Sequence, residues 1–167
     1  MKVSRPNTVD DMVTLIPRLR AYARSLTRNA NDADDLLQET LTKALANLHS
    51  FQEGTALRAW LFTIMRNTFF TQSHKRAREQ PATDDCVSGK AWTPGNQENH
   101  LMGKELMSAI GRLPVLYREM LILVIVLGES YETAAEICHC AIGTVKSRVS
   151  RARNLVIADL EAPPVLA

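Results

Sequence analysis

The segment Ser130–Leu160, SYETAAEICHCAIGTVKSRVSRARNLVIADL, has the pattern of two helices joined by a tight turn. One face of the second helix carries small, polar and basic residues: Gly143, Lys146, Ser147, Ser150, Arg151 and Asn154. The opposite face is apolar and is flanked by Arg148 and Arg153; it consists of Ile142, Val145, Val149, Ala152 and Val156. Small residues allow close approach to DNA, and Lys and Arg reach phosphates and base edges, so this pattern suits the major groove.

The alternative for this segment is an ordinary amphipathic helix with a solvated basic face. The stretch from Lys146 to Arg153 contains four cations and no acid, whereas solvated faces usually mix both signs. The segment therefore favours a helix-turn-helix that binds duplex DNA, with Ser130 as the N-cap of its first helix.

The whole chain has 167 residues and a formal net charge of +2, so any affinity for nucleic acid must come from local clusters. Its first residues, MKVSRPNT, lack the apolar core of a secretory signal. The longest apolar run, Met120–Leu127, is shorter than the roughly 20 residues that span a bilayer. We therefore expect a cytoplasmic protein without a membrane segment.

Abundant helix formers and the absence of period-2 alternation predict an all-α chain. Residues 79–99 lose apolar periodicity and collect Pro, Gly, Asp, Asn and Ser, which is typical of a flexible linker. The expected organisation is two small helical domains, residues 8–78 and 100–161. Trp92 in the linker either docks on a domain or serves a partner, and Cys86 is expected to be an incidental thiol.

Within the first domain, Pro17 is expected to interrupt the first helix and give a helical hairpin or a kinked helix; a short segment before Pro17 and a longer one from it are favoured. Asn31 is expected to cap the next helix, Asp32–Leu48. The start of that helix carries a polar set composed of Asp34, Asp35, Gln38, Glu39 and Thr42. These residues either cap the helix and keep it soluble, or form a docking face for a partner, and their spacing leaves both interpretations open.

The helix predicted over 56–78 has aromatic residues and, at its far end, cations. Such cations either satisfy the helix dipole or hold a nucleic-acid backbone next to aromatic rings that stack on unpaired bases. Phe51, in the preceding loop, is either a lid over the core or a further stacking surface.

Enzymatic function is not expected, because the chain shows no nucleophile–base pair, phosphate loop or cofactor motif. The Cys138-His139-Cys140 run is a poor zinc site, since zinc takes four ligands from separated pairs and no second pair is present. Cys138 is better explained as a core residue of the turn.

Four motifs together resemble the bacterial extracytoplasmic-function (group 4) sigma factors over nearly the full chain. They are DADDLLQETLTKAL at Asp32–Leu45, RAWLFTIMRNTF at Arg58–Phe69, Leu113–Pro114, and SYETAAEI with IGTVKSRVSRAR within Ser130–Arg153. The run SFQEGTALRAWLFTIMRNTF further resembles the alphaproteobacterial general-stress-response subgroup. The family usually has glycine where His139 stands, so we expect a left-handed backbone there, which His tolerates better than most residues.

The resemblance implies a sigma factor that binds core RNA polymerase through both domains, at the β′ clamp and the β flap. The residues implied for clamp binding are Asp34, Asp35, Gln38, Glu39 and Thr42. Those implied for the minus-ten promoter element and its melting are Ser50, Phe51, Trp60, Arg66, Asn67, Lys75 and Arg76. Those implied for the minus-thirty-five element are Thr144, Lys146, Ser147, Arg148, Ser150, Arg151 and Arg153.

The subgroup resemblance also implies a small anti-sigma protein as a partner, and a response regulator whose sigma-like domain competes for it. One alternative is therefore a sigma mimic that binds only the anti-sigma protein; such mimics carry a receiver domain and need no intact basic recognition helix. A simple helix-turn-helix repressor is a second alternative, but it leaves the two surfaces of the first domain unexplained.

Overall fold

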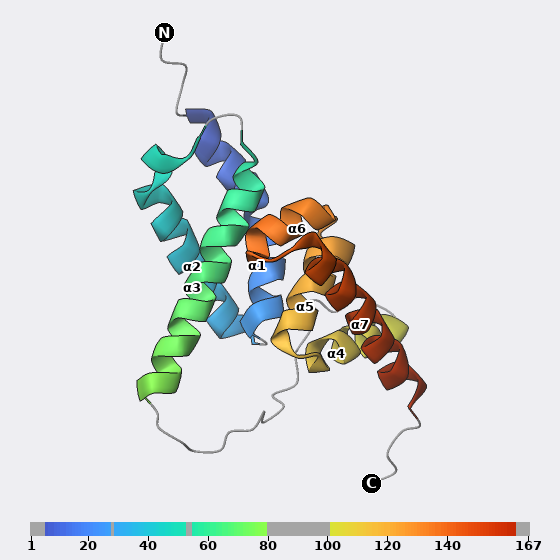
Figure 1. Cartoon of the computed structure of the whole chain (residues 1–167). Coiled ribbons are helices and arrows are strands. Elements are labelled where there is room, and N and C mark those ends of the chain that lie inside the picture. Colours follow the sequence, from blue (N-terminus) through green and yellow to red (C-terminus); the bar gives the residue numbers. More distant parts are fainter. Residues whose placement is uncertain (1–5, 28, 53–54, 80–100, 163–167) are drawn as a thin grey trace.

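The computed structural model describes residues 6–27, 29–52, 55–79 and 101–162 (Figure 1). Every regular element in these ranges is helical, which confirms the all-α prediction. The predicted linker, with Trp92 and Cys86, lies outside the described residues except for Glu79, which is the last residue of a helix. The domain boundaries stay a prediction.

The first domain begins with α1 (Pro6–Thr27), which runs through Pro17 without a break. The prediction of two segments was therefore wrong. Apolar residues on either side of Pro17 stay in register on one buried face, with Met12 before it and Leu19 and Tyr22 after it. The proline is exposed. The packing of this continuous buried face outweighs the loss of the one backbone hydrogen bond that proline cannot donate.

The next helix, α2 (Ala30–Ala46), begins earlier than expected because Asn29, not Asn31, is its N-cap. The Asn29 side-chain oxygen accepts a hydrogen bond of 2.8 Å from the backbone N–H of Asp32. A short 3-10 turn, η1 (Leu48–Ser50), leads on to α3 (Leu57–Glu79). Leu61, Phe62 and Met65 of α3 are fully buried, and α3 packs on α1 and α2 as well as on α6 of the second domain.

The second domain contains α4 (Leu101–Arg112), α5 (Val115–Leu121), the π-helical turn η2 (Ile122–Val126), α6 (Tyr131–Cys138) and α7 (Ile142–Glu161). The apolar run is a helix, as predicted, and it ends at Gly128, whose positive φ of 72° a glycine adopts without strain. Its final turn is π-helical, because the N–H of Leu127 bonds to the carbonyl of Ile122.

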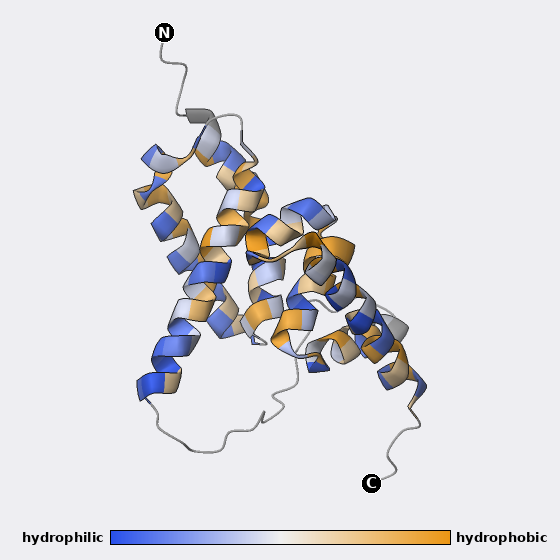
Figure 2. Ribbon diagram, viewed as in Figure 1, coloured by the Kyte–Doolittle hydropathy of each residue, from blue (hydrophilic) through white to orange (hydrophobic). Residues whose placement is uncertain are grey.

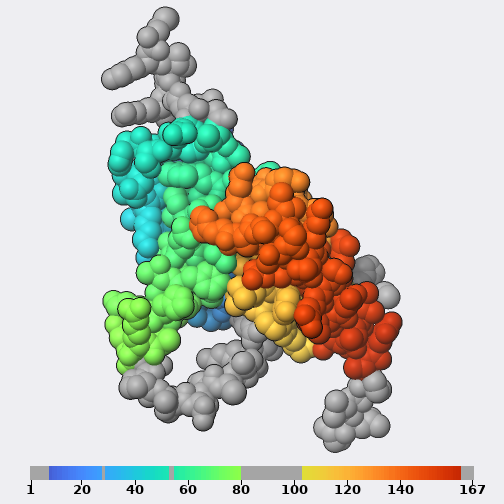
Figure 3. All heavy atoms as spheres, in the orientation of Figure 1, coloured from blue at the N-terminus to red at the C-terminus, as the bar shows by residue number. Residues whose placement is uncertain are grey.

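The two domains lie directly against one another, with α6 across α3 and α5 beside α1 (Figures 1 and 3). The end of α3 that extends away from the second domain is mostly hydrophilic (Figure 2). The predicted DNA-binding helix α7 lies on the side of the second domain away from α2 (Figure 1). This contact between the domains determines which predicted site residues are exposed.

Candidate nucleic-acid interface

The helix-turn-helix has the predicted local geometry. The Ser130 hydroxyl accepts a hydrogen bond of 3.0 Å from the N–H of Thr133, which confirms it as the N-cap of α6. His139 ends that helix with φ 50° and ψ 48°, the predicted left-handed conformation. Cys138 is buried, as expected of a core residue of the turn.

The α7 helix buries one face and exposes the other, as its sequence predicts. Val145, Val149, Ala152 and Val156 are buried. The residues of the expected base-reading face are all exposed: Lys146, Ser147, Ser150 and Arg151. Ile142 differs from the expectation, because it is 40% exposed at the start of the helix. The exposed face is free to enter a groove, since no described element covers it.

The three residues implied as phosphate contacts of α7 do not share one surface. Arg153 is exposed, whereas Thr144 and Arg148 are partly buried. The charge of Arg148 acts on Glu119 of α5: burial raises the pKa of Glu119, and Arg66 and then Arg148 oppose that rise. Arg148 therefore lies near the contact between the domains.

The residues implied for the minus-ten element lie in η1, directly after it, and along α3. The rings of Phe51 and Trp60 lie 5.2 Å apart, and both residues are half-buried. Ser50 and Asn67 are exposed near them along the chain, and Lys75 and Arg76 are exposed at the α3 end. Phe51 packs on Trp60 of its own domain, and part of it stays exposed. A stacking role for this ring stays a prediction.

Arg66 is the exception among these residues, because its side chain is only 14% exposed. Its guanidinium donates two hydrogen bonds of 3.2 Å to the carboxylate of Glu119, which is completely buried. The ring of Phe70 lies 4.6 Å from the same guanidinium. An arginine implied in binding DNA thus has an acidic partner in the other domain.

Other contacts between the domains were missed by the sequence analysis. Buried Arg118 donates to the backbone carbonyls of Ser25 and Leu26 at the end of α1. Arg58 of α3 donates a hydrogen bond of 2.9 Å to Glu129, whose side chain is 1% exposed. The sequence contains one sign of these contacts: Arg118 and Glu119 are adjacent charges at the start of a long apolar run. Charges buried together with such a run need partners.

The predicted docking residues of α2 form a polar face. Asp35, Gln38 and Thr42 are exposed, and Asp34 and Glu39 are partly exposed. Arg20 pairs with Asp34 at 3.2 Å, and Lys43 pairs with Glu39 at 2.8 Å. Gln72 of α3 also donates a hydrogen bond to Glu39.

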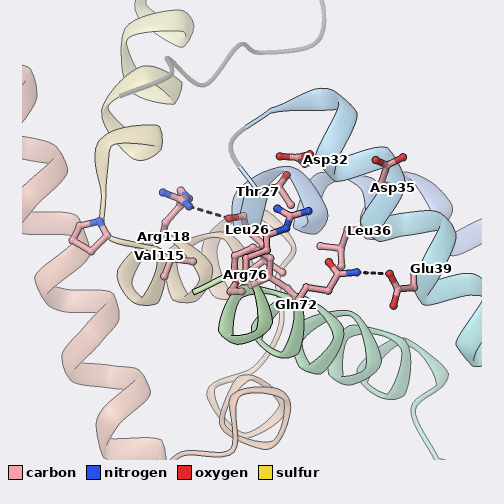
Figure 4. A pocket seen from close by; sticks show the side chains of 13 residues that line it. Leu26, Thr27, Asp32, Asp35, Leu36, Glu39, Gln72, Arg76, Val115 and Arg118 are labelled. Carbon is pink, nitrogen blue, oxygen red and sulfur yellow. Dashed lines mark hydrogen bonds between the residues drawn. The ribbon is translucent and has the colours of Figure 1, made fainter. Parts of the chain in front are cut away.

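A groove of about 950 Å³ begins at this face and extends to the second domain (Figure 4). Asp32, Asp35 and Glu39 line it from α2, and Gln72 and Arg76 from α3. Val115 and Arg118 contribute from α5, so both domains form the groove.

Within the described residues, no group of three or more His, Cys, Asp or Glu side chains is placed to hold a metal ion. None of the described helices combines the length and the apolar character needed to cross a bilayer.

Sequence comparisons place both domains in known families. Residues 12–66 match the family described as the Sigma2 domain of PhyR, and residues 103–156 match Sigma-70, region 4. The chain is 50% identical over 151 residues to the ECF RNA polymerase sigma factor EcfG of Rhodopseudomonas palustris, covering 90% of this chain and 83% of that protein.

Two solved structures share the fold. The sigma factor RpoE of Bartonella quintana, in complex with the anti-sigma factor NepR, is 42% identical, with a TM-score of 0.83 over 93% of this chain and 98% of RpoE. The anti-anti-sigma factor PhyR from the same organism has a TM-score of 0.59 over 92% of this chain and 51% of PhyR, at 18% identity that shows the fold alone. The identity to EcfG and its coverage show that the chain belongs to the extracytoplasmic-function RNA polymerase sigma factors, non-enzymatic proteins that direct core polymerase to specific promoters.

Proposed function

We propose that this sigma factor reads the minus-thirty-five element with Lys146, Ser147, Ser150 and Arg151 of α7, supported by phosphate contacts from Thr144, Arg148 and Arg153. The observation that carries this assignment is the exposed, acid-free face of α7 opposite an apolar face that is buried from Val145 to Val156. A recognition helix needs both properties, because one face must be fixed on the domain while the other enters the groove.

The first domain contacts and melts the minus-ten element in this proposal. Phe51 and Trp60 offer ring surface to an unpaired base, and Ser50 and Asn67 offer polar groups beside it. Arg66, Lys75 and Arg76 hold the DNA backbone. Capture of an unstacked base needs no catalytic residue, since stacking and hydrogen bonds offset an unstacking cost of about a few kcal/mol.

The α2 face is the proposed docking site for the polymerase β′ clamp, through Asp34, Asp35, Gln38, Glu39 and Thr42, and the second domain meets the β flap. Support comes from the exposure of Asp35, Gln38 and Thr42. The protein acts in the cytoplasm in this scheme, as part of a stress response.

A small anti-sigma protein is the proposed occupant of the groove between the domains. The groove has three carboxylates on its α2 wall and apolar side chains of Leu36, Phe69 and Val115, which suits an amphipathic helix with basic residues. The similar sigma factor RpoE was solved with an anti-sigma factor. An occupant of this groove would cover Asp35 and Glu39 and so compete with polymerase.

In-vitro transcription with purified core polymerase and a promoter library tests the proposed function. Promoter-specific transcripts that depend on this chain support it. A sigma mimic would bind an anti-sigma protein and yield no transcripts, and a simple repressor would bind DNA without core polymerase and initiate nothing. Either result would overturn the proposal.

A further inference from the structure

The carboxylate of Glu39 is held on both of its oxygens, and its partners come from two helices. The Nζ of Lys43, one turn further along α2, lies 2.8 Å from Oε1. Gln72 of α3 donates a hydrogen bond to Oε2 (Figure 4). The Glu39 side chain is 39% exposed, so the held carboxylate still faces solvent on the α2 face.

Lys43 is in turn anchored in the body of the first domain. Its Nζ donates a hydrogen bond of 3.2 Å to the hydroxyl of Thr68, a residue of α3 that is only 3% exposed. An exposed ion pair between residues four apart on a helix contributes little by itself, because ordering two long side chains costs entropy. Here the buried hydroxyl of Thr68 and the amide of Gln72 tie this pair to a neighbouring helix at two points.

We propose that Gln72 and Thr68 are positioning residues for polymerase binding: together with Lys43 they hold the Glu39 carboxylate in the orientation in which the α2 face meets its partner. This inference rests on the proposed docking role of that face. It extends the docking site from α2 to α3, a helix whose implied partner was DNA alone.

A carboxylate held in this way is still able to bind. Its two oxygens offer about four acceptor sites, and Lys43 and Gln72 use two of them. The remaining sites suit a cation on the partner, such as an arginine. Glutamate is among the side chains that lose most rotamer freedom when they are fixed. Because Glu39 loses this freedom during folding, less is lost when the partner binds, and binding is tighter.

Releasing Glu39 is expected to weaken binding to core polymerase by about twofold to tenfold, the range that corresponds to ordering one flexible side chain. Thr68→Val removes the buried acceptor of Lys43, and Gln72→Met removes the donor to Oε2, and neither substitution changes a charge. Thr63→Val is the matched control on the same helix, since the Thr63 hydroxyl donates to the carbonyl of Ala59. It is expected to leave binding unchanged.

Surface plasmon resonance of the full-length variants on immobilised core polymerase measures the dissociation constants. Circular dichroism on the same samples shows whether each variant is folded at the temperature used. If Thr68→Val unfolds the domain, Gln72→Met, at a partly exposed position, provides the test on its own.

Each substitution is repeated in a chain that carries Glu39→Ala. A positioning residue acts through Glu39, so its substitution should have no further effect once that carboxylate is removed. A general structural role, or a direct contact with polymerase, would weaken binding equally in both backgrounds, and that result would overturn the proposal.

Glu39→Ala by itself separates this inference from the proposed function. Weaker binding of Glu39→Ala with unchanged binding of Gln72→Met and Thr68→Val would overturn the positioning role and leave the docking face as proposed. Unchanged binding of Glu39→Ala would overturn the docking role of Glu39 and, with it, the inference. Weaker binding of all three single variants, with no further weakening in the Glu39→Ala background, supports both.

Discussion

At the scale of single residues, identical chemistry has different consequences at different places in this chain. The sequence predicts that Arg151 and Arg66 both lie on helices and contact DNA. Arg151 is exposed on α7, whereas Arg66 is held by a buried carboxylate of the other domain. The side chain alone does not determine its role, because an arginine binds whichever anionic oxygen lies within its reach.

Arg151→Ala is expected to cost about 1–3 kcal/mol in binding at the minus-thirty-five element and to relax specificity there, because a base-reading contact is lost. The measurement is binding of the holoenzyme to promoters with single base changes in that element. Arg153→Ala, the matched loss of a proposed phosphate contact, should weaken binding to all sequences alike. A uniform loss with Arg151→Ala would assign that residue to phosphate as well.

His139→Gly is expected to stabilise the chain by about 1 kcal/mol. A left-handed backbone costs a residue with a Cβ about 1–2 kcal/mol, and glycine avoids that cost. Part of the gain is lost because glycine loses more conformational entropy on folding. Thermal unfolding followed by circular dichroism measures the change. His139→Ala keeps the Cβ and should show no gain; an equal gain from both variants would contradict the backbone explanation.

At the scale of elements, helix starts and ends follow local chemistry, but continuity depends on packing. Asn29 and Ser130 cap their helices through short side-chain hydrogen bonds. Pro17, a strong breaker by itself, lies inside α1 because its helix keeps one buried face on both sides. Tertiary contacts therefore overrode the strongest local signal in the first domain.

Pro17→Ala is expected to stabilise the chain by about 1–3 kcal/mol, since it restores a backbone donor in an exposed position within the helix. Urea denaturation measures the shift in midpoint. Val13→Ala, at another exposed position of α1, serves as the comparison. Destabilisation by Pro17→Ala would mean that the proline ring itself contributes to the structure of α1.

Asp35→Lys reverses a charge on the exposed part of the α2 face and is expected to weaken binding to core polymerase by about tenfold or more. Co-purification and a quantitative binding titration provide the measurement. Glu161→Lys, an exposed reversal at the end of α7, should leave binding unchanged. Undiminished co-purification of Asp35→Lys would exclude this face as the clamp site.

At the scale of the whole molecule, the contact between the domains links the proposed DNA surfaces to each other. Burial raises the pKa of Glu119, and this rise exceeds the lowering by Arg66 and Arg148. Tyr22 and Cys138, the other titratable groups beside it, also have raised pKa values through burial and so stay neutral near pH 7. Of these three groups, Glu119 has the lowest ordinary pKa, so its charge is the first to change as pH rises.

Closure of the two domains on one another is therefore expected to depend on pH. A raised pKa means that the closed arrangement favours protonated Glu119, so closure is strongest below the ordinary glutamate pKa and weakens as pH rises through the raised value. Energy transfer between dyes on Ala46→Cys and Glu161→Cys, two exposed positions, should therefore fall as pH rises above the ordinary glutamate pKa. Glu119→Gln should lack this component, and identical pH profiles would rule out Glu119 as its source.

The family resemblance predicted the left-handed turn at His139. The sequence alone determined the helical class, the cap of α6 and the two faces of α7. These last three features depend on neighbouring residues and on the 3.6-residue period, both of which can be read along the chain. The tertiary structure decided that α1 continues through Pro17, that Arg66 meets Glu119 across the domain boundary, and that Arg118 bonds to the end of α1. Pairs between distant residues leave no periodic signal, because they exist only once packing has brought their helices together.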